Sequence, residues 1–138
     1  MRFIITILTM LVSISALAKP LSYYFEQDVK FDPSIPTPEQ VLGYEVGEWH
    51  VRHDQLVQYM QILAEKSDRM NFKVIGRTHE QRPLVMLTIT ASDKLGQVEQ
   101  IRKAHLARLN GEASDSSKQP AVVWMGYSVH GNESSGSN

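Results

Sequence analysis

Two side chains of the types that bind metal ions lie close together, at His130 and Glu133, separated by Gly131 and Asn132. A histidine and a glutamate three residues apart can converge on one ion where the segment turns. A neutral imidazole together with a carboxylate suits Zn²⁺. Gly131 permits a tight backbone, and Asn132 tolerates unusual dihedral angles. A catalytic zinc would need one further protein ligand and an open position for water.

The spacing H-x-x-E is a weak signal by itself, because a surface loop can hold a histidine and a glutamate by chance. The position of the His130 and Glu133 pair in the chain strengthens the metal-site interpretation. The pair follows residues 121–127, a nearly continuous apolar run typical of a strand buried on both faces in the middle of an α/β sheet. Functional sites in such sheets gather at the carboxyl ends of the strands. The position therefore favours a metal site over a chance pairing.

The remaining histidines are weaker candidates. His50 and His53 form a second possible metal pair, but solvated polar residues at the start of a helix are the stronger interpretation of them. His79 falls in an expected turn and should be exposed. His105 lies beside the apolar stripe of an expected helix, where a histidine is more often a boundary residue than a ligand.

The other residues with notable side chains are better explained by structural roles. Arg82 precedes an expected strand and should make a structural ion pair, while Trp124 and Met125 should lie in the core. Ser134, Ser135 and Ser137 could suggest a nucleophile, but Ser134-Ser135-Gly136 lacks the G-x-S-x-G elbow of a serine hydrolase.

The composition excludes several classes of protein. The chain has 138 residues, 42% apolar and 21% charged, which is typical of one globular domain. A formal net charge of −1, with scattered basic residues, argues against nucleic-acid binding. The absence of cysteine excludes disulfides, thiolate ligands and a thiolate nucleophile, so a metal site must use His, Asp or Glu.

The first 18 residues resemble an export signal. Arg2 is followed by an apolar run over residues 3–17. The small residues Ala16 and Ala18 lie three and one positions before a cut after Ala18, which fits cleavage by a signal peptidase. The run is short for a transmembrane anchor, which needs about 20 apolar residues. We therefore expect a secreted or periplasmic protein that starts near Lys19 and has no membrane attachment after cleavage.

The mature chain divides into a lead-in and a domain. Residues 19–48 should be irregular, because Pro20, Pro33, Pro36 and Pro38 interrupt regular structure. Within them, T-P-E-Q at residues 37–40 predicts a short helix opened by a capping box. Residues 49–138 should form the N-terminal part of a catalytic domain.

Hydrophobic periodicity predicts the order of elements in this domain. Amphipathic helices are expected over residues 52–67 and 95–109, strands over 71–78 and 84–90, and a buried strand over 121–127. The first two strands are close enough to pair as an antiparallel hairpin. The order indicates an α/β fold with a mixed β-sheet and helices on both faces. Because the sequence stops soon after the buried strand, we expect the fold to be incomplete.

Two segments resemble the zinc carboxypeptidases, the carboxypeptidase A/B-like metallopeptidases. I-G-R-T-H-E-Q-R-P-L at residues 75–84 is similar to their early hairpin, often I-G-x-[ST]-x-E-G-R-P-L. V-W-M-G-Y-S-V-H-G-N-E at residues 123–133 resembles their first metal motif. The resemblance covers roughly residues 50–138. Gln81 stands where the family usually has glycine, and Ser134 and Ser135 replace a Pro-Val-like pair.

The resemblance implies a zinc-dependent hydrolase that removes C-terminal residues from peptides, with His130 and Glu133 as the first two zinc ligands. The family's second histidine ligand, its carboxylate-binding arginine and its general-base glutamate lie downstream and have no counterpart here. The chain should therefore hold no catalytic residue of its own and be incompetent alone. The alternatives are a zinc amidohydrolase or deacylase of the aspartoacylase type, and a non-catalytic secreted remnant or binding module.

Overall fold

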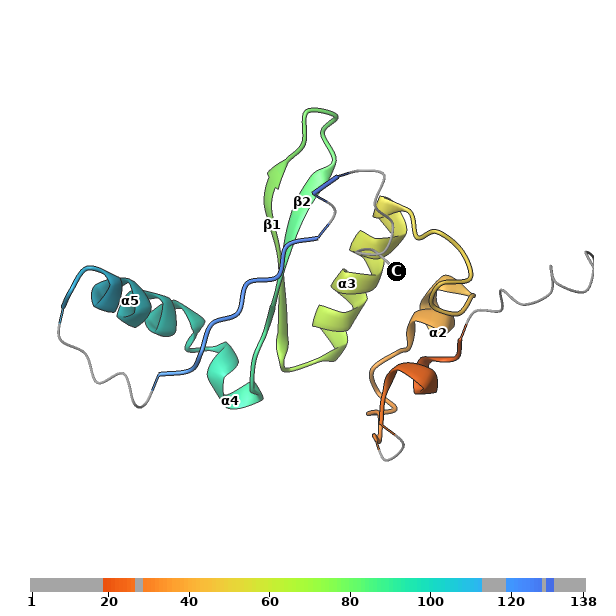
Figure 1. The fold of residues 1–138 in the computed structure, drawn as a ribbon, viewed down its shortest axis with the longest axis horizontal. Coiled ribbons are helices and arrows are strands. Elements are labelled where there is room, and N and C mark those ends of the chain that lie inside the picture. Colours follow the sequence, from red (N-terminus) through yellow and green to blue (C-terminus); the bar gives the residue numbers. More distant parts are fainter. Residues whose placement is uncertain (1–18, 27–28, 113–118, 128, 131–138) are drawn as a thin grey trace, which may run out of the picture.

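The computed structural model describes residues 19–26, 29–112, 119–127 and 129–130 (Figure 1). Its elements, in chain order, are the 3-10 turn η1 (Leu21–Tyr24), the helices α2 (Pro38–Leu42) and α3 (His53–Lys66), the strands β1 (Met70–Arg77) and β2 (Pro83–Ile89), and the helices α4 (Ser92–Leu95) and α5 (Val98–Leu109).

The short helix α2 is capped at both ends. The Thr37 hydroxyl accepts from the Gln40 amide at 3.4 Å, and the Gln40 side chain accepts from the Thr37 amide at 2.9 Å. Gly43 ends the helix in the left-handed conformation, at φ 83°, where a residue without Cβ is unstrained. The predicted capping box is confirmed.

Helix α3 begins and ends one residue inside the predicted range. Most of its apolar residues share one half-buried stripe, made of Leu56, Val57, Met60, Leu63 and Ala64, whereas Gln58 and Gln61 are exposed. This stripe is the face expected from the helical period. The helix packs on β1 and, less extensively, on β2, so it covers one face of the hairpin.

The two strands form the predicted antiparallel hairpin. Met70 pairs with Ile89 and Arg77 with Pro83, with a shift in register between Val74 and Gly76. Phe72 lies opposite Leu87, and both side chains are half-buried. Cross-strand apolar pairs of this kind stabilise a hairpin, which is marginal in water without a packed face.

The hairpin turn places Gln81 in the left-handed region, at φ 65°. The Gln81 amide donates to the Thr78 carbonyl at 2.9 Å, the Thr78 amide donates to the Arg82 carbonyl at 2.9 Å, and the Arg77 guanidinium donates to the Gln81 carbonyl at 2.8 Å. This is the position where the carboxypeptidase motif usually has glycine. The glutamine at this position therefore imposes strain on a turn that is closed by these hydrogen bonds.

Replacing Gln81 with glycine should stabilise the chain. The left-handed conformation costs a residue with a Cβ about 1–2 kcal/mol, and glycine removes this strain. Part of the gain, roughly 0.5–1 kcal/mol, is offset because glycine gives the unfolded chain more conformational freedom. The net gain should be about 0.5–1 kcal/mol, measured from the urea midpoint. Gln58→Gly, at an exposed position inside α3, should instead lose about 1 kcal/mol. A loss in both variants would contradict the strained turn.

The second predicted helix is present but shorter. The helical residues divide into α4 and α5, separated by Gly96 and Gln97, so the main helix begins at Val98 and not at residue 95. Figure 1 shows α5 apart from the hairpin, and Leu109 at its end is 68% exposed. In the described part of the chain, α5 has no extensive contact with another helix or strand, unlike the packed helix that the sequence pattern anticipates.

The prediction of a buried strand over residues 121–127 is wrong for this structure. These residues form no strand, and Val123, Trp124 and Met125 are 79%, 74% and 67% exposed, so Trp124 and Met125 are not core residues. A central strand needs a hydrogen-bonded neighbour on each side. In the described part of the chain, the sheet consists of β1 and β2 paired with each other, and residues 121–127 are not in it.

The fold class predicted from the sequence, an incomplete α/β fold, is confirmed by the helices and the small antiparallel sheet. Within the described ranges, helix α3 covers one face of the hairpin, and a helical layer on the other face is not seen. Among these residues Val51 alone is buried, at 8% exposure. No helix of the described part is both long and apolar enough to cross a membrane.

Candidate metal centre

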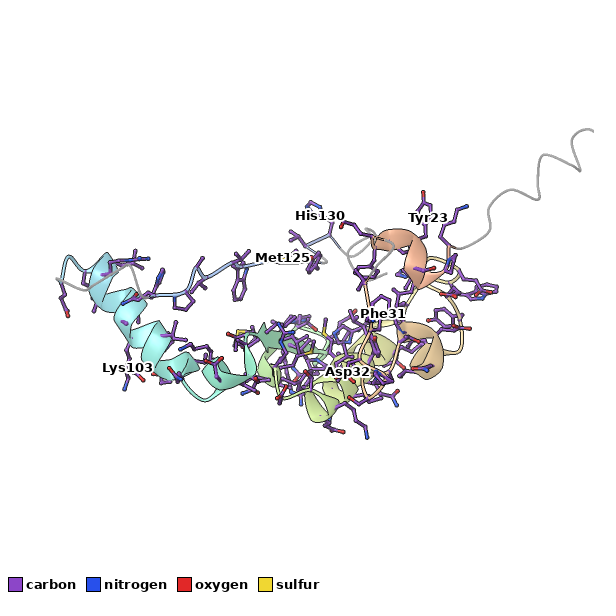
Figure 2. All side chains as sticks on the ribbon, turned by 90° about the horizontal axis from the view of Figure 1, so that it is seen from below. Tyr23, Phe31, Asp32, Lys103, Met125 and His130 are labelled. Atoms are coloured by element: carbon purple, nitrogen blue, oxygen red, sulfur yellow. The ribbon has the colours of Figure 1, made fainter. Side chains whose placement is uncertain are left out.

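His130 lies just beyond the extended segment 119–127, after a bend that begins at Val129, and its side chain is exposed. Figure 2 shows His130 and Met125 along this segment, away from Lys103 on α5. Glu133, the other predicted ligand, lies outside the described residues, and its pairing with His130 stays a prediction.

Across the described ranges, no three His, Cys, Asp or Glu side chains gather closely enough to hold a metal ion. The second histidine pair is also not arranged as a site. His53 Nε2 lies 3.0 Å from the Pro83 carbonyl oxygen, to which it donates, so this nitrogen is engaged in a hydrogen bond and not offered to a metal. His50 is exposed. The interpretation of these histidines as a metal pair is therefore not supported.

His53 has a structural role that the sequence did not reveal. Its hydrogen bond joins the first residue of α3 to the first residue of β2, 30 positions away, and the side chain is half-buried. His53 does lie at the start of a helix, as expected, but it is half-buried where a solvated side chain was expected. Periodicity reports only which face a residue lies on, so no local signal could have identified Pro83 as its partner.

His79, His105 and Arg82 lie as expected. His79 is exposed in the hairpin turn, and His105 is half-buried on α5, where its Nδ1 accepts from Arg108 at 3.1 Å. Arg82 makes the predicted ion pair with Glu80, at 3.1 Å, with both side chains largely exposed. Ser134, Ser135 and Ser137 lie outside the described residues.

The perturbed carboxylates belong to local surface pairs. A hydrogen bond from Arg52 lowers the pKa of Asp54, and a hydrogen bond from Arg102 lowers the pKa of Glu99. In each pair the partners are two or three residues apart and largely exposed. Such pairs are screened by solvent and contribute little to stability. Their lowered pKa values therefore reflect helix-surface pairing and not the tuning of a catalytic acid or base.

Comparison with curated proteins and with solved structures gave no match. The family model for zinc carboxypeptidase matches residues 56–138, which is more than half of the chain. The matched region contains most of α3, the hairpin, α5 and the H-G-N-E motif with His130 and Glu133. By this match, the chain belongs to the zinc carboxypeptidase family.

Proposed function

We propose that these residues are the N-terminal part of the catalytic domain of a zinc-dependent carboxypeptidase that removes C-terminal residues from peptides. Family membership supports a carboxypeptidase-like hydrolase acting on peptides in general. The observation that carries the finer proposal is the H-G-N-E motif inside the matched region, directly after an apolar segment. The same match favours a peptidase over an amidohydrolase or deacylase.

His130 and Glu133 are the residues that would hold the zinc. An imidazole nitrogen and a carboxylate oxygen are both first-choice zinc donors. Zinc, when bound, polarises the scissile carbonyl and lowers the pKa of its bound water. The part of His130 and Glu133 in this chemistry is to fix the ion beside the segment that carries them.

The exposed apolar segment supports the proposal that the intact enzyme has more sheet than this chain. Val123, Trp124 and Tyr127 are between 58% and 79% exposed, an arrangement that costs free energy in water. In the intact domain we propose that residues 121–127 become an inner strand and bring His130 to the end of a rigid element. The family's third ligand and general base match no position here, so we propose that this chain alone does not hydrolyse peptides.

Export is part of the proposed function. Residues 1–18 have the charge, apolar run and small-residue cleavage pattern of a signal peptide. The proposed enzyme acts in the periplasm or outside the cell, on the C-termini of peptides or proteins.

The test is the zinc affinity of the purified chain lacking residues 1–18, measured by titration against a competing zinc indicator. We expect one zinc per chain, bound more weakly than the roughly 10 kcal/mol or more of a complete structural site. Tight binding would show that these residues already hold a full ligand set, contrary to the proposal. Absence of binding at any zinc concentration would contradict the assignment of the ligands.

A further inference from the structure

Residues 36–51, here called the strap, pack on helix α3 although they lie upstream of the region that matches the family. The strap consists of α2, a turn that begins at Gly43, and an irregular segment that leads to Val51. Figure 1 shows α2 beside α3, and the two helices are in contact. The strap is thus folded onto the domain and is not merely the irregular lead-in that the prolines indicate.

Two tyrosine hydroxyls form hydrogen bonds between the strap and the region of α3. The Tyr59 hydroxyl, on α3, donates to the Pro36 carbonyl at 3.1 Å. The Tyr44 hydroxyl, on the strap, donates to the Gln55 side-chain oxygen at 3.4 Å. That oxygen also accepts from the Arg52 amide at 3.2 Å, so Gln55 joins the strap to the start of α3. Partial burial raises the pKa of Tyr59, which agrees with a hydroxyl sequestered in this contact.

Apolar packing accompanies these hydrogen bonds. Val51, the most buried side chain of the described residues, lies at the end of the strap. Together with Leu42, Val46, Leu56 and Tyr59 it lines an almost wholly apolar cavity of about 110 Å³ between the strap and α3. The interface is therefore packed from both sides but incompletely filled.

We propose that the strap is a structural clamp on α3, so that the folded unit of this protein begins near residue 36 and not at the start of the family match. The clamp holds the helix that covers the hairpin. A simple linker between the export signal and the domain would have no such effect, because its side chains would not contribute to the stability of α3. Because the cavity lies between the strap and α3, a substitution at Val51 can enlarge it or fill it. If the strap is a clamp, the first change should destabilise α3 and the second should stabilise it.

The test uses a matched pair of substitutions at Val51 in the chain lacking residues 1–18, with hydrogen exchange measured at the amides of α3. Val51→Ala should speed exchange about tenfold or more, because it enlarges the cavity. Val51→Ile should slow exchange about fourfold, the effect of one further buried methylene, since the cavity has room for it. Val29→Ala, at an exposed valine outside the strap, should change nothing.

A second variant tests the hydrogen bonds. Tyr59→Phe leaves the Pro36 carbonyl without its donor and should speed exchange in α3 by about threefold to tenfold. If Val51→Ala fails to fold, the slower exchange of Val51→Ile still supports the clamp. Exchange in α3 that is unchanged in both Val51→Ile and Tyr59→Phe would overturn it and leave the strap as a linker.

Discussion

Replacing His130 with alanine should weaken zinc binding by this chain at least a hundredfold. Loss of an outer-shell partner alone costs roughly 10–100-fold in metal affinity, and loss of a direct ligand should cost no less. With two ligands in the proposed site, removing one leaves a single carboxylate. The expected result is therefore near-complete loss of the bound zinc in a competition titration at neutral pH.

Three further variants show which side chains hold the zinc. His79→Ala removes an exposed histidine from the hairpin turn and should leave the affinity unchanged. Glu133→Gln keeps the size of the side chain but removes its charge, and should behave as His130→Ala does. His50→Ala examines the rival histidine pair. Loss of zinc in His50→Ala, with binding retained in His130→Ala, would place the site at the start of α3 and refute the assignment.

Replacing Val123 with lysine should leave the stability of this chain unchanged while greatly increasing its solubility. Val123 is 79% exposed, and substitutions at such positions usually change the free energy of unfolding by less than about 0.5 kcal/mol. Its neighbours form an uncharged, β-branched and aromatic run of the kind that drives association between chains. We expect the urea midpoint to hold and the soluble fraction after concentration to rise several-fold.

The same substitution separates the two descriptions of residues 121–127. If the segment were a strand buried on both faces, as its composition predicts, an unpaired lysine there would cost more than about 4 kcal/mol and unfold the chain. Lys118→Ala is a suitable control, because it removes a charge just before the same run. A collapse of the urea midpoint in Val123→Lys alone would show that the run is buried in solution.

The elements that the sequence predicted well are those whose determinants are local. The capping box of Thr37 and Gln40, the bounds of α3, and the hairpin all depend on residues a few positions apart. The strained turn at Gln81 could also be anticipated, from the glycine that the family usually has there. Helix α5 was placed correctly except at its start, where Gly96 and Gln97 interrupt the pattern.

The features that the sequence did not predict depend on distant partners. An apolar run such as residues 121–127 becomes a strand only where neighbouring strands accept its hydrogen bonds, so its composition could not decide the outcome. The bond between His53 and Pro83 and the clamp on α3 likewise join separate segments. At the metal site, the sequence identified His130 and Glu133 by type and spacing, and the structure adds the exposure of His130.

The contact between α3 and the hairpin has a consequence for the order of folding. All of its partners lie within residues 53–89, and even the bond from His53 to Pro83 spans only 30 positions. Contacts this local have a low loop-closure cost and form quickly, before slower pairing between distant strands. We therefore expect this helix and hairpin to act as an early nucleus of folding.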